Sequence, residues 1–161
     1  MIDIFKKTLE ELKLKKLDVI DKDLNRPWGG FFVISEENAQ DFADIYFNGL
    51  NTDSLKVSGK LSPKILLIAP NKRLSWQYHR RRCEIWKVSS GKINVITSKD
   101  NIEKNKVLLI KGDEIKIAQD ERHRIIGLDE VAVIAEIWIH TDKGNPSDED
   151  DIVRVQDDYG R

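Results

Sequence analysis

Three side chains that can bind a metal ion lie close together in the stretch Ser75 to Trp86: Gln77, His79 and Glu84. Gln77 and His79 are two residues apart, so on an extended strand their side chains point to the same face. Glu84 follows a short turn and opens the next apolar run. His123, one of only three histidines, also follows a turn and begins an apolar run. Because zinc and similar ions need three or four protein ligands, the sequence predicts a fold that gathers these four residues at one centre.

The residue types set the chemistry that such a centre offers. Imidazole nitrogen and carboxylate oxygen suit zinc, iron, manganese, cobalt or nickel, and Gln77 adds a fourth, oxygen-donating ligand. An ion that keeps one position open for water or substrate acts as a Lewis acid. Taken singly, each residue also has a purely structural interpretation. A lone histidine is commonly a hydrogen-bonded polar residue, and a lone glutamate is commonly a surface charge.

Basic side chains crowd the same part of the chain. Arginine binds phosphate oxygens in a bidentate manner, so a phosphate site is the sharper interpretation. A nucleic-acid surface is a second interpretation, but neighbouring acids and a formal net charge of −1 weigh against it. Lysine and arginine also protect exposed strand edges from unwanted pairing. The residues are Lys64, Lys72, Arg73, Arg80, Arg81, Arg82, Arg122 and Arg124.

Length and composition narrow the class of protein. The chain has 161 residues and one cysteine, Cys83, so it is long enough to bury a core and cannot form an internal disulfide. The start, Met1 to Lys7, lacks the apolar core of a signal peptide, and no apolar run approaches the roughly 20 residues of a membrane helix. We therefore expect a soluble cytoplasmic protein with neither a membrane nor a nucleic-acid partner.

The first 25 residues differ in character from the remainder. Apolar residues recur at helical spacing from Ile2, which predicts an amphipathic helix to about Leu17. Its apolar face would cover a sheet edge or a partner subunit. The polar stretch Asp18 to Asn25 is interpreted as a connector. The expected organisation is a helix and connector over residues 1–25 and one domain over residues 26–161.

The remainder reads as an all-β domain. The block Arg26-Pro27-Trp28-Gly29-Gly30 predicts a sharp turn, with Trp28 either in the core or in a pocket wall. From Lys64 onward, short apolar runs are separated by turn residues at intervals of about 8–12 residues, which is typical of a sandwich or barrel. The sequence has no repeating strand-helix-strand pattern, so a parallel sheet is not expected. The acidic cluster before Ile152 is followed by apolar residues, so the C-terminal segment is expected to fold back on the barrel.

Several blocks together resemble a known family. The chain is similar to the cupin domain of type II mannose-6-phosphate isomerases, which is also the C-terminal part of bifunctional mannose-1-phosphate guanylyltransferase/isomerase enzymes. The similarity extends from Arg26 to the end, and its most specific part is the final block. No glycine-rich nucleotidyltransferase block is present, so the resemblance implies no guanylyltransferase activity. The matching blocks are Arg26-Pro27-Trp28-Gly29, Lys64 to Pro70, Leu74-Ser75 with Gln77 and His79, Arg82 with Glu84 and Trp86, Gly91, His123-Arg124, Glu136, Glu149 to Arg154, and Asp158 to Arg161.

The resemblance implies a cupin double-stranded β-helix, a jelly-roll barrel, with a divalent metal, commonly zinc, at its mouth. It implies interconversion of mannose 6-phosphate and fructose 6-phosphate through an enediolate, a step toward nucleotide-sugar precursors. Glu84 and Glu136 are the alternatives for the general base, and a homodimer is plausible. Arg161 can hold the phosphate or steady the enediolate only if the C-terminal segment reaches the barrel mouth. The predicted residues are Glu84, Glu136, Arg161 and Lys64 for catalysis, Arg26, Trp28, Lys64, Arg82, Arg124 and Arg161 for the sugar phosphate, and Gln77, His79, Glu84 and His123 for the metal.

One position departs from the family pattern. The family usually has a second histidine two positions after the first, and here that position is Arg81. Either the remaining four ligands suffice, a set that resembles the ligands of type I phosphomannose isomerases, or the site is weakened. In the second case the protein would be a cupin that binds a sugar phosphate or nucleotide sugar without turning it over. A histidine restored at Arg81 should raise metal affinity only if that side chain points into the site.

Overall fold

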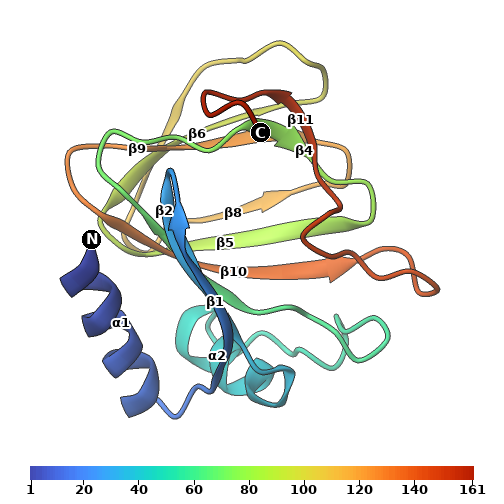
Figure 1. The fold of residues 1–161 in the computed structure, drawn as a ribbon. Helices are drawn as coiled ribbons and strands as arrows, with labels where there is room; N and C mark the ends of the chain where they lie inside the picture. The colour runs from blue at the N-terminus through green and yellow to red at the C-terminus, as the bar shows by residue number, and fades with distance from the viewer.

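The computed structural model describes residues 1–161 as two antiparallel sheets that face each other, with two α-helices on one side (Figure 1). One sheet has the order β1-β2-β3-β10-β5-β8 and the other β11-β4-β9-β6-β7. The all-β prediction is confirmed. The elements are α1 Ile2–Leu14, β1 Val19–Arg26, β2 Gly29–Ile34, η1 Glu36–Asn38, α2 Ala39–Tyr46, β3 Lys64–Ile68, β4 Trp76–Tyr78, β5 Arg82–Ser90, β6 Lys92–Ser98, β7 Val107–Ile110, β8 Glu114–Ile117, β9 Arg122–Gly127, β10 Ala132–His140 and β11 Val153–Gln156.

The inner strands of the six-stranded sheet, such as β3 and β10, are buried on both faces, which explains their long apolar runs. In β3, Leu66 and Ile68 pack in the core between the sheets, whereas Ile65 and Leu67 pack in a second core on the outer face. α1 and α2 cover that outer face with apolar side chains such as Phe5. Alternation along each strand therefore decides which residues can reach the barrel interior.

The N-terminal prediction is correct for the helix and wrong for the connector. α1 ends at Leu14 rather than Leu17, and the chain then reverses through Lys16, whose φ of 57° is left-handed. The stretch after it, expected to be a connector, forms β1, an edge strand that pairs with β2. The side chains of this edge strand are exposed or half-buried, so they can be polar. Neither helix combines the length and the apolar character that a membrane crossing requires.

The turn between β1 and β2 depends on a glycine. Gly29 has φ +141°, and a Cβ atom there would lie 1.9 Å from the carbonyl oxygen of Leu67. Only glycine therefore lets the hairpin approach β3 this closely. The turn holds Arg26 and Trp28 at one end of the barrel.

The C-terminal segment folds back on the barrel, as expected, and β11 pairs with β4 (Figure 1). Its main anchor is Asp151, whose carboxylate accepts hydrogen bonds of 3.0 Å from the backbone N–H groups of both Arg80 and Arg81. The Ser147 hydroxyl donates to the same carboxylate at 2.6 Å. Farther along, Arg73 forms a two-pronged ion pair with Asp158. The acidic cluster is thus a docking element.

His140 joins this segment to β10 in its neutral form. The backbone N–H of Ser147 donates to His140 Nδ1 at 3.0 Å, so the ring proton sits on Nε2, which lies 3.1 Å from the hydroxyl oxygen of Ser62. Burial, with a smaller effect of Arg82 and nearby lysines, lowers the pKa of His140 to about 4. Protonation would remove the acceptor that Ser147 uses.

We expect the free energy of unfolding to fall as pH drops from about 6.5 toward 4, because the unfolded chain binds a proton at His140 that the folded chain excludes. His140→Gln should remove about 1.4 kcal/mol per pH unit from that slope. Urea unfolding in EDTA at a series of pH values measures both slopes. His79 and His123 act in the same direction but are common to both proteins, so identical slopes would contradict the assignment.

Candidate metal centre

His79, Glu84 and His123 meet at one buried point, although they come from different parts of the two sheets. The His79 and His123 Nε2 atoms are 3.2 Å apart, and Glu84 oxygens lie 3.2 Å from the first and 3.6 Å from the second. Ligand atoms held 2.0–2.2 Å from zinc at tetrahedral angles are about 3.3–3.6 Å apart. These three side chains therefore fit a zinc-like ion.

Backbone carbonyls fix the tautomer of both histidines. His79 Nδ1 lies 2.6 Å from the carbonyl oxygen of Asp151, and His123 Nδ1 lies 2.8 Å from that of Glu121. A carbonyl only accepts, so each Nδ1 carries the proton and each Nε2 is unprotonated, with its lone pair directed at the centre. Such outer partners orient histidine ligands in metal sites. Both lone pairs belong to the atoms that converge on Glu84.

The electrostatics suit a divalent cation. Burial lowers the pKa of His79 to about 3 and also lowers that of His123, so both rings are neutral at pH 7. Burial alone would raise the pKa of Glu84, but the permanent charge and the hydrogen bond of Arg82 oppose that shift, and the pKa of Glu84 lies below its ordinary value. Metal ligands must be deprotonated, and here they already are.

Gln77 adjoins the three ligands. Its cross-strand neighbours are His123 on β9 and Arg154 on β11. Its amide nitrogen lies 3.5 Å from His79 Nε2, while its oxygen accepts from Ser75. The Ser75 hydroxyl can accept as readily as donate, so a half-turn of the amide keeps this bond and directs the oxygen at the centre. Gln77 as a fourth ligand stays a prediction.

Arg81, at the position of the family's second histidine, points away from the centre. Its guanidinium donates to the carbonyl oxygens of Asn145 and Pro146 at 3.2 and 3.1 Å and to Asp148 at 3.1 Å. β4 has already ended at Tyr78, so strand alternation does not carry from His79 to Arg81. Arg81 holds the C-terminal segment and does not block the ligands.

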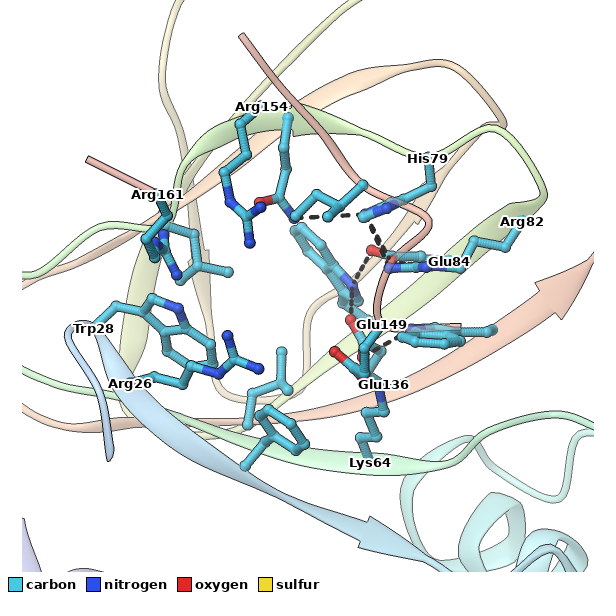
Figure 2. Close-up of a pocket in the computed structure, with 17 residues that line it drawn as sticks. Arg26, Trp28, Lys64, His79, Arg82, Glu84, Glu136, Glu149, Arg154 and Arg161 are labelled. Atoms are coloured by element: carbon cyan, nitrogen blue, oxygen red, sulfur yellow. Dashed lines mark hydrogen bonds and ion pairs between the residues drawn. The ribbon is translucent and has the colours of Figure 1, made fainter. Parts of the chain in front are cut away.

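A pocket opens beside the metal centre, and Glu136 lies in its wall (Figure 2). The indole N–H groups of Trp86 and Trp138 each donate to Glu136 at 3.0 Å. Glu136 is directly paired across the sheet with Lys64 on one side and Trp86 on the other. Burial, reinforced by the charge of Glu84, raises the pKa of Glu136 to about 7. A carboxyl with this pKa can exchange a proton at neutral pH.

Three arginines line the opposite side of the pocket: Arg26, Arg154 and Arg161 (Figure 2). Arg154 has a buried Nε atom without a hydrogen-bond partner. Burial and the charge of Arg161 lower the pKa of Arg154. Arg161 is held by a two-pronged pair with Asp157. Guanidinium groups that lie together with unused donors form a site for an anion.

The structure brings most of the predicted site residues together. Lys64 pairs with Glu149 and lies 3.5 Å from the centre of the Trp138 ring. Trp28 is buried in the inner core and also forms part of the pocket wall, so both interpretations of it hold. The predicted residues on the pocket wall are Arg26, Trp28, Lys64, Gln77, His79, Arg82, Glu84, Glu136 and Arg161.

Two predicted residues do not line the pocket: His123, which belongs to the metal centre beside it, and Arg124. Arg124 follows His123 on β9, so it points to the opposite face, where it pairs with Glu103 at 2.5 Å and with Gln156. The expectation that it contacts a sugar phosphate is not met by this geometry. Conversely, Arg154, Glu149 and Trp138 line the pocket and were not predicted. Trp138 is two residues after Glu136 on one strand, so alternation could have identified it.

We expect His79→Ala or His123→Ala to weaken zinc binding by at least about 100-fold, because each removes a ligand and changes to outer partners alone cost 10–100-fold. His140→Gln, which changes the third histidine, should stay within about threefold. Competition with a chromophoric chelator gives all three dissociation constants. Equal zinc affinity in the ligand variants and the control would show that the ion binds elsewhere.

For Arg81→His we expect no gain in zinc affinity, because the side chain at this position points toward Asn145 and Asp148. The loss of its hydrogen bonds should lower the free energy of unfolding by about 1–3 kcal/mol. Zinc titration and urea unfolding of the same variant test both parts. A tenfold gain in affinity would mean that this loop can turn residue 81 inward.

Sequence comparisons match the chain to one family and to parts of larger proteins. Residues 36–157 match the family described as Mannose-6-phosphate isomerase C-terminal. Alginate biosynthesis protein AlgA of Pseudomonas aeruginosa is 30% identical over 122 residues, which are 76% of this chain and 24% of that protein. Mannose-1-phosphate guanylyltransferase of Escherichia coli is 27% identical over 158 residues, 97% of this chain and 27% of that protein. The chain thus spans about a quarter of the length of these curated relatives.

Comparison with solved structures agrees on the fold. Oxalate decarboxylase from Bacillus subtilis superposes with a TM-score of 0.59 at 13% identity, over 86% of this chain and 30% of that one. The coconut allergen cocosin superposes with a TM-score of 0.58 at 13% identity, over 86% of this chain and 31% of that one. These likenesses confirm the predicted cupin fold. Since the family match also extends over residues 36–157, the chain belongs to the Mannose-6-phosphate isomerase C-terminal family.

Proposed function

We propose that the chain is a metal-dependent sugar-phosphate isomerase that interconverts mannose 6-phosphate and fructose 6-phosphate. The observation that carries the proposal is Glu136, a buried carboxyl with a pKa near 7, in a pocket that is also lined by His79 and Glu84 of the metal centre. An aldose-ketose isomerase needs a proton acceptor of this kind next to a group that steadies developing negative charge. Membership of the family supports the choice of sugar.

The layout of the pocket suggests how the substrate lies. The three arginines on one side would bind the phosphate, and C1 and C2 would then reach the metal centre on the other. Arg154 is the strongest candidate of the three, because its buried Nε atom lacks a hydrogen-bond partner and, unlike Arg26 and Arg161, it forms no ion pair. Lys64 adds a positive charge next to Glu136.

Glu136 is the better of the two candidates for the base. Glu84 is held ionised among the metal ligands, whereas Glu136 faces the pocket with its pKa raised. Glu136 would take the C2 proton of the open-chain aldose and return it to C1, while protons exchange between the two oxygens and the carbonyl moves from C1 to C2. The Trp86 and Trp138 N–H groups would hold its carboxylate in place. A bound zinc ion would supply Lewis acidity to the substrate oxygens.

A second candidate is a cupin that binds a sugar phosphate or nucleotide sugar without turnover. Arg81 at the position of a family ligand favours it, since one metal ligand is lost. Such a binding protein would keep the arginine side of the pocket but would not catalyse the isomerisation.

An assay that couples mannose 6-phosphate to fructose 6-phosphate detection separates the two. It uses protein stripped of metal and reloaded with zinc, cobalt, manganese or nickel. We expect metal-dependent turnover, and Glu136→Gln should lower kcat by about 10²–10⁴-fold because it removes the proton acceptor. Glu103 lies outside the pocket beside Arg124, so Glu103→Gln is the matched control and should keep wild-type kcat.

Two results would contradict the proposal. Turnover that survives intact in Glu136→Gln would remove this base from the mechanism. Absence of turnover with every metal, from folded protein that still binds mannose 6-phosphate in calorimetry, would favour the binding cupin.

A further inference from the structure

Arg82 occupies the metal centre in a way that the family resemblance does not explain. Its guanidinium is buried and donates from Nε to Glu84 at 2.8 Å and from Nη2 to His79 Nε2 at 3.1 Å. From Nη1 it donates to the Ser147 hydroxyl at 2.8 Å and to the carbonyl of Asp148 at 3.1 Å. One side chain thus spans the ligands and the C-terminal segment.

The bond to His79 leaves no room for a metal bond at the same atom. His79 Nδ1 carries the ring proton, because it faces the carbonyl of Asp151. His79 Nε2 therefore has a single lone pair, which the Arg82 N–H now uses. Glu84 has two oxygens and can serve both partners, but His79 cannot.

Charge acts in the same direction. The guanidinium is a permanent cation that neutralises the ionised Glu84 within a buried site. A divalent cation at the ligands would face this positive charge a few ångströms away, where screening by water is weak. The same guanidinium is also held 3.6 Å from the ring centre of Trp138. Several contacts at once therefore hold the positive charge of Arg82 where it opposes binding of the ion.

We propose that Arg82 is an internal competitor of the metal: it takes the His79 lone pair when the centre is empty and must release it before an ion can bind there. Since Nη1 of the same group holds Ser147 and Asp148, metal affinity is set in part by how firmly the C-terminal segment holds Arg82. This inference concerns the metal centre and holds whether the chain is an isomerase or a binding protein.

The test compares two arginines that hold the same segment but differ at the centre. Arg82→Met removes the competitor, whereas Arg81→Met removes contacts to Asn145, Pro146, Asp148 and Asp151 and none to the metal ligands. Cobalt and zinc dissociation constants are measured for both variants and wild type by chelator competition at pH 7.5. We expect the Arg82→Met constants to be at least about tenfold lower than wild type, and those of Arg81→Met to lie within about threefold.

Affinity that is unchanged or weaker in Arg82→Met would overturn the proposal. A milder variant keeps the test decisive if that protein does not fold. Ser147→Ala removes one acceptor of Arg82 Nη1 and should lower the cobalt dissociation constant two- to threefold. A constant equal to or above wild type in folded Ser147→Ala would refute the link between the segment and the ion.

Discussion

The candidate site depends on the loop that joins β4 to β5, since this loop crosses from one sheet to the other and carries His79. Asp151 holds the loop in shape: its carboxylate receives two backbone N–H groups, and its carbonyl receives the ring N–H of His79. The residue that fixes the ligand thus lies 72 positions later in the chain. Because the same segment continues into β11, docking it also brings Arg154 and Arg161 to the pocket. The same docked segment therefore supports the metal centre and supplies two of the three arginines of the anion side.

Within the strands, the site follows from alternation and could be predicted from the sequence. Glu84 and Trp86 share a face on β5, and Gln77 on β4 lines the same pocket as His79, which directly follows the end of β4. The same rule separates His123, which joins the centre, from Arg124, which does not. Residue type and family position predict Arg124 as a phosphate ligand, whereas alternation turns its side chain away from the pocket.

Outside the strands, the sequence carried less information. The direction of Arg81 is decided by partners more than 60 residues away, and no local pattern predicts them. β1 was missed because an exposed edge strand has no apolar alternation to reveal it. Arg154 belonged to the block that carried the family resemblance, yet its place in the pocket depends on the register between β11 and β4. Long-range pairing of this kind is a property of the folded chain.

The two carboxyl groups of the pocket show how one environment can produce two roles. Both are buried, and the single indole N–H of Trp86 lies within hydrogen-bond distance of each, at 3.1 Å from Glu84 and 3.0 Å from Glu136. Glu84 lies beside the Arg82 guanidinium, whose charge and hydrogen bond favour its ionised form. The pKa of Glu136 is instead raised by burial and by the charge of Glu84 itself. Any change that neutralises Glu84 would therefore also lower the pKa of Glu136, and so the ligand set and the proton acceptor cannot be tuned independently.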